Sequence, residues 1–279
     1  MDLTHAMLNG SLIRAEEAVI SAYNIEYTYG FGVYESIRVT NGIAYFLDNH
    51  IERLLESARI ISLFHSVSHD DVRSWVHALM ATITDESYNL KILLIGAPSP
   101  ERVQCFILPL RPSFPDKRWY KRGVTVSVAQ YERLFPQAKT LNMLGSYLAY
   151  NSAKKNGHYD ALLTERNGHI TEGTRTNVLF IRGNSIVTPP NESILPGITR
   201  DVVLHVAQKL HIPLLIEPIP LTRISEFGGA FLTSTSSKIL PIRAVADQEF
   251  GELPPTLLSL MNEFSSYLAS SKGIFRKEH

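Results

Sequence analysis

Residues 159–190 read YDALLTERNGHITEGTRTNVLFIRGNSIVTPP, and this stretch decides the class of fold. It holds four short β-rich runs separated by polar or glycine-bearing turns, which is the pattern of successive strands. Gly183 and Asn184 supply the turn between the last two runs. Residues 199–210 then follow a helical period, with four apolar residues on one face: Val202, Val203, Val206 and Leu210. The stretch predicts an α+β fold.

The sequence before this stretch has the same mixed character. Two β-rich runs in IRVTNGIAYFL flank Asn41 and Gly42, a pair that tolerates positive φ, so we expect a tight hairpin. Apolar residues at helical spacing follow and predict a helix that runs to about Ile61. We expect Asp48 or Asn49 to cap it, because short polar side chains accept hydrogen bonds from the first turn.

A domain boundary is expected where this pattern breaks. A second helix near residues 70–83 and the strands LKILLIG and VQCFILPL lead to RPSFPDKRWYKRG, which is charged and carries prolines. We therefore predict a small N-terminal α/β domain over residues 1–112 and a linker over 113–122. The large domain would span 123–279, with a final helix near 256–268 and a frayed tail, GIFRKEH.

Composition narrows the classes of function. The chain has 279 residues and equal numbers of basic and acidic side chains, 27 of each, so no net charge favours nucleic acid or anionic lipid. No apolar run approaches the roughly 20 residues that span a bilayer, and the first residues lack a secretory pattern. The single cysteine, Cys105, lies in an apolar run. We expect a cytoplasmic protein with a small-molecule partner.

Two segments are candidates for binding an anion. LPGITRD places Pro196 and Gly197 before a helix, so the N–H groups of Ile198 and Thr199 are available to a phosphate. The alternative is that Thr199 only caps the helix. Residues 233–237 are all hydroxyl-bearing and join two apolar runs, and they offer donors to a phosphate or a carboxylate, or form a solvated turn.

Three charged residues are candidates for chemistry. Lys139 lies among apolar neighbours in FPQAKTLNML, which suits a lysine nucleophile with a lowered pKa, although most lysines are solvated surface groups. Glu172 precedes a glycine turn, and its alternative is a pair with Arg175. Arg53 either binds a phosphate or pairs with Glu56 three residues on.

Several other kinds of site are excluded. His65 and His69 have a spacing that suits a metal in a helix, but no third ligand is near, so we predict no metal site. The chain has no G-x-S-x-G, no P-loop and no G-x-G-x-x-G motif, which removes the hydrolase, nucleotide and dinucleotide fingerprints.

Taken in order, six blocks resemble those of the fold type IV pyridoxal-phosphate enzymes: YGFGVYESIR, HIERLLESA, AKTLNML, YDALLTERNGHITEGTRTN, TPPNESILPGITRD and FLTSTSSKILPI. The resemblance covers nearly the whole chain. It implies a two-domain fold with a mixed, barrel-like large domain, a pyridoxal 5'-phosphate cofactor and a homodimer with active sites near the interface.

The resemblance also implies roles for individual residues. Lys139 would form the Schiff base with the cofactor, Glu172 would face the ring nitrogen, and Arg53 would bind the phosphate. Further cofactor contacts would come from Asn177, Ile198, Thr199, Thr235 and Ser236. The last two also match the part of the family that contacts the substrate carboxylate, and the substrate pocket would include Tyr29, Tyr34 and Arg38.

The reaction expected is transfer of an amino group between an amino acid and a 2-oxo acid. GVYESIR, TPP and LPGITRD resemble the branched-chain aminotransferases, but these usually have Gly-Asn-Tyr after the lysine, where this chain has Asn142 and Met143. KTLNML and TEGTRTN are more similar to D-amino acid aminotransferases, with Lys91 or Arg102 as the basic residue that binds the carboxylate. An aminodeoxychorismate lyase is a further alternative, and a non-catalytic cofactor-binding protein is a fourth.

Overall fold

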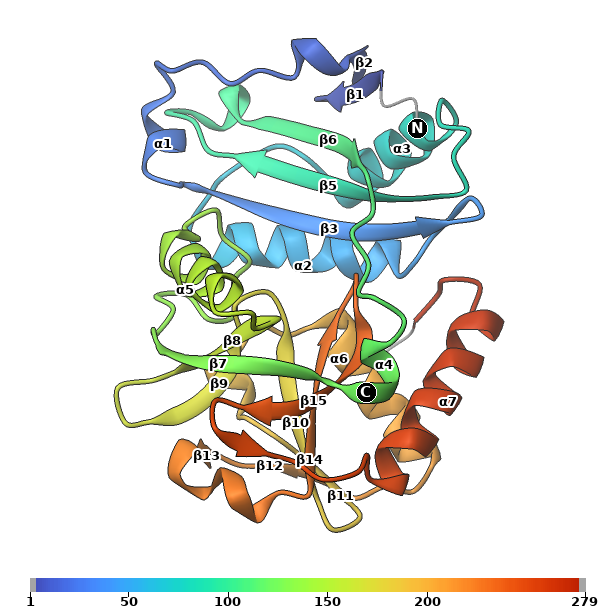
Figure 1. Cartoon of the computed structure of the whole chain (residues 1–279). Helices are drawn as coiled ribbons and strands as arrows, with labels where there is room; N and C mark the ends of the chain where they lie inside the picture. The colour runs from blue at the N-terminus through green and yellow to red at the C-terminus, as the bar shows by residue number, and fades with distance from the viewer. Residues whose placement is uncertain (1–3, 276–279) are drawn as a thin grey trace. The chain divides into compact units, whose positions relative to one another are not determined.

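The computed structural model describes residues 4–275, and the chain divides into two compact units (Figure 1). Of the described residues, the first unit contains 4–113, Ala138–Met143 and 271–275, and the second contains Phe114–Gln137 and Leu144–Ser270. This division differs from the predicted domains because a short segment around Lys139 and the C-terminal residues group with the first unit.

The first unit contains a six-stranded antiparallel sheet with an apolar core on one side. Strand β3, which lies next to the edge strand β4, pairs with β5 along its full length. The predicted hairpin is confirmed, since Asn41 (φ 51°) and Gly42 (φ 74°) turn β3 into β4. In spatial order the strands are β2 (Ser11–Arg14), β1 (His5–Leu8), β6 (Gln104–Leu110), β5 (Ser87–Ile95), β3 (Gly32–Thr40) and β4 (Ile43–Ala44).

Helices α2 (Leu47–Ile60) and α3 (His69–Met80) bury their apolar faces in this core. Both were predicted, but the cap of α2 was wrong: its N-cap is Phe46, in a left-handed conformation, and the Asp48 carboxylate instead accepts from Arg73 Nε (2.9 Å). Ser68 caps α3, in a capping box with Asp71. The remaining helices of the unit are short: η1 (Ala15–Glu17), α1 (Ile25–Thr28) and η2 (Pro100–Arg102).

The C-terminal segment packs on the start of α2. The N–H of Phe46 donates to the carbonyl of Gly273 (2.7 Å), and the ring of Phe275 is buried edge-on against the ring of Phe46, with centroids 6.2 Å apart. The expected fraying of GIFRKEH is therefore wrong for Gly273–Phe275, while residues 276–279 lie outside the described residues.

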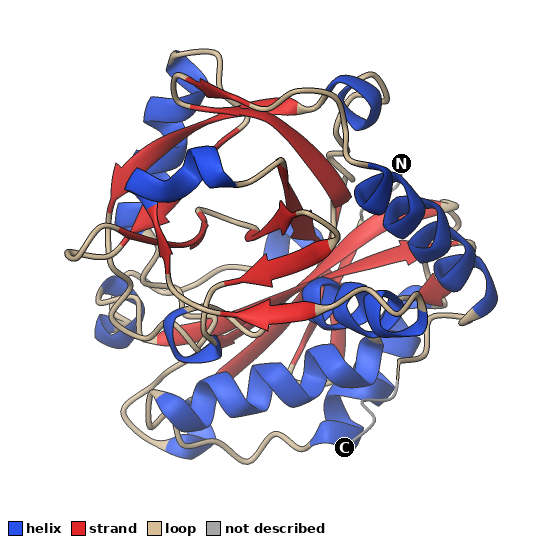
Figure 2. Ribbon diagram, turned by 90° about the horizontal axis from the view of Figure 1, so that it is seen from below, coloured by secondary structure: helices blue, strands red, loops and turns tan. Residues whose placement is uncertain are grey.

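The second unit is a mixed β-barrel, as predicted. Its six strands pair in a closed ring, and the pair Glu172–Asn177 between β9 and β10 closes it. The curvature of these strands can be followed in Figure 2. Around the ring the strands are β10 (Asn177–Arg182), β14 (Gly229–Ser234), β15 (Lys238–Val245), β7 (Val124–Gln130), β8 (Asp160–Thr164) and β9 (His169–Gly173). Short strands extend the sheet: β11 (Ser185–Thr188), β12 (Leu214–Ile216), β13 (Ile219–Pro220) and β16 (Gln248–Glu249).

Helices α6 (Ile198–Lys209) and α7 (Pro255–Ser270) lie close to their predicted positions, residues 199–210 and 256–268. The other helices of the unit are α4 (Trp119–Arg122), α5 (Leu144–Lys155), η3 (Asn191–Ser193) and η4 (Leu221–Glu226). Part of the predicted linker is α4, and the Tyr120 hydroxyl donates to the carbonyl of Ser237 (3.0 Å), so this stretch packs within the unit. No helix among residues 4–275 is long and apolar enough to cross a membrane.

Candidate active site

Lys139 is held at the edge of β3 in the first unit. The N–H of Tyr34 donates to the carbonyl of Lys139 (2.9 Å), and the N–H of Leu141 donates to the carbonyl of Gly32 (2.8 Å). A Cβ at Gly32 would lie 2.7 Å from the Leu141 side chain and 2.8 Å from the carbonyl of Leu94, so only glycine permits this approach. The backbone of the lysine is therefore fixed by strand-type hydrogen bonds.

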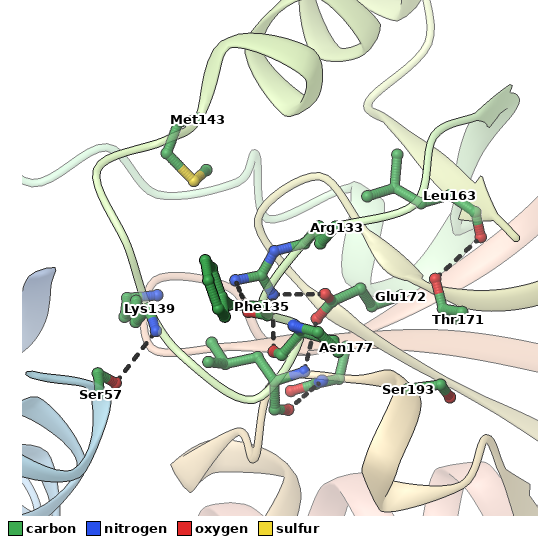
Figure 3. Close-up of polar contacts among 12 residues, drawn as sticks. Ser57, Arg133, Phe135, Lys139, Met143, Leu163, Thr171, Glu172, Asn177 and Ser193 are labelled. Atoms are coloured by element: carbon green, nitrogen blue, oxygen red, sulfur yellow. Dashed lines mark hydrogen bonds and ion pairs between the residues drawn. The ribbon is translucent and has the colours of Figure 1, made fainter. Parts of the chain in front are cut away.

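Helix α2 supplies a further contact to the same lysine. The N–H of Lys139 donates to the hydroxyl of Ser57 (3.0 Å), which is fully buried (Figure 3). Sequence reasoning missed Ser57, although it lies four residues after Arg53, on the same face of the helix. Ser57 is thus a second constraint on the position of Lys139.

The Lys139 ammonium lies beside an aromatic ring. Its Nζ is 4.7 Å from the centroid of the Tyr34 ring, and Lys91 Nζ is 5.4 Å from the same centroid. The Tyr34 hydroxyl contacts Met143 Sδ at 3.8 Å. Of the two basic residues considered for binding a carboxylate, Lys91 lies at Tyr34, whereas Arg102 is exposed in η2.

Arg53 is engaged by a buried carboxylate. Its Nε donates to Glu35 Oε1 (2.7 Å) and its Nη2 to Glu35 Oε2 (2.8 Å), and His50 Nδ1 lies 2.7 Å from the same Oε2. The alternative pairing with Glu56 is wrong, because Glu56 accepts from Arg59. Glu35 and His50 are buried in the first unit.

Burial and neighbouring charges shift the pKa values of Glu35 and His50. Burial alone would raise the pKa of Glu35, but Arg53 and His50 outweigh it and hold the pKa well below its ordinary value. Burial lowers the pKa of His50, against the opposing effect of Glu35. The resulting state is a neutral imidazole whose Nδ1–H donates to an ionised carboxylate.

Glu172 is held on two sides in the second unit. Its Oε1 accepts from Arg133 Nη1 (2.7 Å) and its Oε2 from the N–H of Leu195 (3.1 Å) (Figure 3). The alternative pair with Arg175 is wrong, since that guanidinium lies 3.8 Å from the centroid of the Tyr150 ring. Sequence reasoning missed Arg133, which no local spacing connects with Glu172.

A row of polar side chains crosses the barrel from Glu172. Glu172 lies opposite Asn177 in the strand register, and Asn177 lies opposite Thr233, so the three side chains share one face of the sheet. Asn177 Nδ2 donates to the carbonyl of Leu195 (2.9 Å). The Thr233 hydroxyl is buried and has no hydrogen-bond partner. An orphaned buried hydroxyl carries a cost, and a hydrogen bond to a bound ligand would remove this cost.

The row reaches the N-terminus of α6. The N-cap is Gly197, and Thr199 does not cap the helix with its side chain, contrary to the alternative interpretation. A Cβ at Gly197 would lie 1.8 Å from Asn177 Oδ1, so the close approach of this turn to the row requires glycine. The first amides of α6, at Ile198 and Thr199, together with the helix dipole, favour an anion.

The other residues predicted to bind the cofactor or the substrate lie in several different places. Thr235 and Ser236 form the apex of a turn held by Ser234 and Ser237, whose hydroxyl oxygens are 2.7 Å apart. Tyr29 is 79% exposed, and Arg38 lies four residues beyond Tyr34 along β3, about 13 Å at the usual strand rise. Residues 4–275 contain no cluster of metal-binding side chains.

The sequence matches the profile of a known family over most of its length. Residues 32–245 match the family described as Amino-transferase class IV, and the chain belongs to this family. A putative branched-chain-amino-acid aminotransferase of Methanocaldococcus jannaschii is 29% identical over 271 residues, which cover 90% of this chain and 92% of that one. A D-alanine aminotransferase of Bacillus licheniformis is 28% identical over 261 residues, covering 89% and 91%.

Solved structures show the same fold. The branched-chain amino acid aminotransferase of Escherichia coli superposes with a TM-score of 0.88 at 23% identity, covering 95% of this chain and 94% of that one. The branched-chain aminotransferase of the thermophilic archaeon Thermoproteus uzoniensis, solved with norvaline, has a TM-score of 0.86 at 25% identity, covering 96% and 95%. Fold type IV is thereby confirmed for this chain.

The buried His50 predicts a loss of stability on mild acidification. Because its pKa in the folded protein lies below the ordinary value of 6.5, the unfolded chain binds a proton first as the pH falls. The free energy of unfolding should therefore decrease below pH 6.5, by up to about 1.4 kcal/mol per pH unit for this group. Urea denaturation between pH 7 and 5 measures the slope.

His50→Gln should reduce this slope. His65, whose pKa is also lowered by burial, remains in the variant, so only part of the pH dependence should disappear. An unchanged slope in His50→Gln would show that the buried imidazole does not bind its proton in the way described.

Proposed function

We propose that the protein is a pyridoxal-phosphate-dependent transaminase that moves an amino group between an amino acid, preferably branched-chain, and a 2-oxo acid. The observation that carries this proposal is the fixed position of Lys139. Three backbone hydrogen bonds to Lys139 and Leu141 hold the segment against β3 and α2, with the amine beside Tyr34. A solvent-exposed lysine on the protein surface needs no such constraint on its backbone.

The donor set of the second unit suits this cofactor. The uncapped start of α6 and the orphaned Thr233 hydroxyl suit a phosphate, and Glu172 suits a protonated ring nitrogen. Arg133 and the N–H of Leu195 orient the Glu172 carboxylate. In the first unit we assign the phosphate-binding role to Arg53. Thr235 and Ser236, at the apex of their turn, are proposed to contact the phosphate and the substrate carboxylate.

When bound, pyridoxal phosphate supplies an electron sink for the substrate α-carbon. Lys139 would hold the cofactor through its amine, and the same amine, when free, would serve as the base and acid that moves the α-proton of the substrate. The backbone hydrogen bonds of Lys139 fix the point from which its side chain extends toward Tyr34. Glu172 would keep the ring nitrogen of the cofactor protonated, and Tyr34 would orient the substrate.

Absorption spectroscopy tests the assignment of Lys139. Wild-type protein with added cofactor should show a yellow, protein-bound band, and Lys139→Ala should lack it because no amine is left to bind the cofactor covalently. Lys91→Ala, which removes the other ammonium beside Tyr34, is the matched control and should keep the band. A band of equal intensity in Lys139→Ala would rule the assignment out.

The branched-chain preference rests on the surroundings of Lys139. Tyr34, Met143 and Leu141 present aromatic and apolar surface, and Lys91 provides a cation beside Tyr34 for a carboxylate. The relatives named for branched-chain and for D-alanine substrates are nearly equal in identity. The donor that bleaches the yellow band without an acceptor decides between them: L-leucine supports the proposal and D-alanine supports the second candidate. If neither acts, aminodeoxychorismate becomes the substrate to assay.

Thr233 offers a test that separates binding from stability. Thr233→Val removes a buried hydroxyl without a partner, so the cofactor-free protein should be as stable as the wild type or more so, by about 1–3 kcal/mol. Its affinity for pyridoxal phosphate should fall. The matched control is Thr171→Val, whose hydroxyl donates to the carbonyl of Leu163 (3.3 Å) and whose loss should destabilise the protein. Urea denaturation and cofactor titration give the two readouts. A Thr233→Val protein with unchanged affinity would contradict the role.

We further propose a cytoplasmic homodimer. Each unit has exposed apolar residues that lie close together in the sequence: Tyr23, Ile25 and Tyr29 near α1 in the first, and Leu144, Tyr147 and Leu148 at helical spacing in α5 in the second. Apolar surface of this kind marks a protein interface. Light scattering should give twice the mass of the chain, and a fully active monomer would contradict the proposal. The buried thiol of Cys105, in a chain with one cysteine, fits a reducing compartment.

A further inference from the structure

The first unit buries a charged cluster that the proposed chemistry does not use directly. Glu35 extends from β3, and His50 and Arg53 extend from one face of α2 to meet its carboxylate. The Glu35 side chain is fully buried and that of His50 is 1% exposed. Both carboxylate oxygens have partners at 2.7–2.8 Å.

Stability alone does not explain this cluster. Removing a carboxylate and a guanidinium from water costs more than their attraction often returns, and well-packed apolar side chains stabilise such a position equally well. The surrounding core residues, such as Ile37, Ile51 and Leu54, are apolar and fully buried. A buried ion pair in this setting therefore indicates that the orientation of one of its members matters.

The geometry shows which member is oriented. Glu35 contacts Arg53 through two parallel hydrogen bonds, to Nε and Nη2, and such a bidentate pair fixes the plane of the guanidinium. The pairing with Glu35 engages the Nε and Nη2 edge of the guanidinium, and Nη1 lies outside this pair. His50 Nδ1 on Oε2 in turn limits rotation of the carboxylate.

We propose that Glu35 is a positioning residue that aims the outer edge of Arg53 at the phosphate of the cofactor, and that His50 holds Glu35 in place. This inference rests on the proposed function. It assigns to Glu35 no contact with the cofactor or the substrate. Since Ser57 follows on the same face of α2 and binds the backbone of Lys139, one helix would position both the phosphate-binding arginine and the reactive lysine.

The test compares two ligands that differ only in the phosphate. Apoprotein is titrated with pyridoxal 5'-phosphate and with pyridoxal, for wild type and Glu35→Gln. Glu35→Gln should weaken pyridoxal phosphate binding by about tenfold or more, the size of one charge-assisted hydrogen bond, and leave pyridoxal binding unchanged. In an Arg53→Gln background, Glu35→Gln should weaken pyridoxal phosphate binding little further, because both changes remove the same interaction.

Glu217→Gln is the matched control. Glu217 accepts a similar pair of hydrogen bonds from Arg182 (2.8 and 3.1 Å), but both side chains are about one-third exposed and belong to the second unit. This variant should bind both ligands as the wild type does. If Glu35→Gln fails to fold, Glu35→Asp keeps the charge but shortens the side chain, and should show a smaller loss that is again confined to pyridoxal phosphate.

Two results would overturn the inference alone. They are an equal loss of affinity for both ligands, which is the mark of a purely structural role, and no loss for either ligand in a folded Glu35 variant. A wild-type protein that binds neither ligand would instead overturn the proposed function, and this inference with it.

Discussion

The short pairing of Lys139 and Leu141 with β3 is the constraint on which the proposed site depends. Without it, Lys139 would belong to the loop that joins β7 to α5, and its amine would have no fixed position. The pairing replaces loop freedom with strand geometry at the residue to which we assign covalent binding of the cofactor. It is possible only because Gly32 has no side chain, and α2 strengthens it through Ser57.

Each unit uses regular elements to hold its charged groups. In the first unit a strand and a helix face each other across the Glu35 carboxylate, and in the second the closing pair of the barrel is itself Glu172 and Asn177. A carboxylate in a sheet moves less than one in a loop, because its backbone is bonded on both sides. The strand pair that closes the barrel therefore also fixes the backbone of Glu172, the proposed partner of the ring nitrogen.

Much of this organisation could be predicted from the sequence. The hairpin at Asn41 and Gly42, the strands of residues 159–190 and the longer helices follow from local pattern, which is strong where apolar periodicity is long. The cap of α2 could not be predicted, because Phe46 is held by Gly273, a residue more than two hundred positions away. The partners of Arg53 and Glu172 were predicted wrongly for the same reason: the true partners are distant in the sequence. Local spacing offered Glu56 and Arg175, whereas the fold brings Glu35 and Arg133, and no single sequence carries the register that joins them.

The division of the chain also sets an order of events during synthesis. Every strand of the first sheet has been made once residue 110 leaves the ribosome, yet Ala138–Met143 emerges later and Ser271–Phe275 last. The sheet can thus form before the lysine arrives to dock on it, and the start of α2 waits for the carbonyl of Gly273 until translation is nearly complete. A nascent chain would therefore carry a folded first sheet before the lysine of the proposed site has been made, so a half-made chain would lack the amine to which we assign the chemistry.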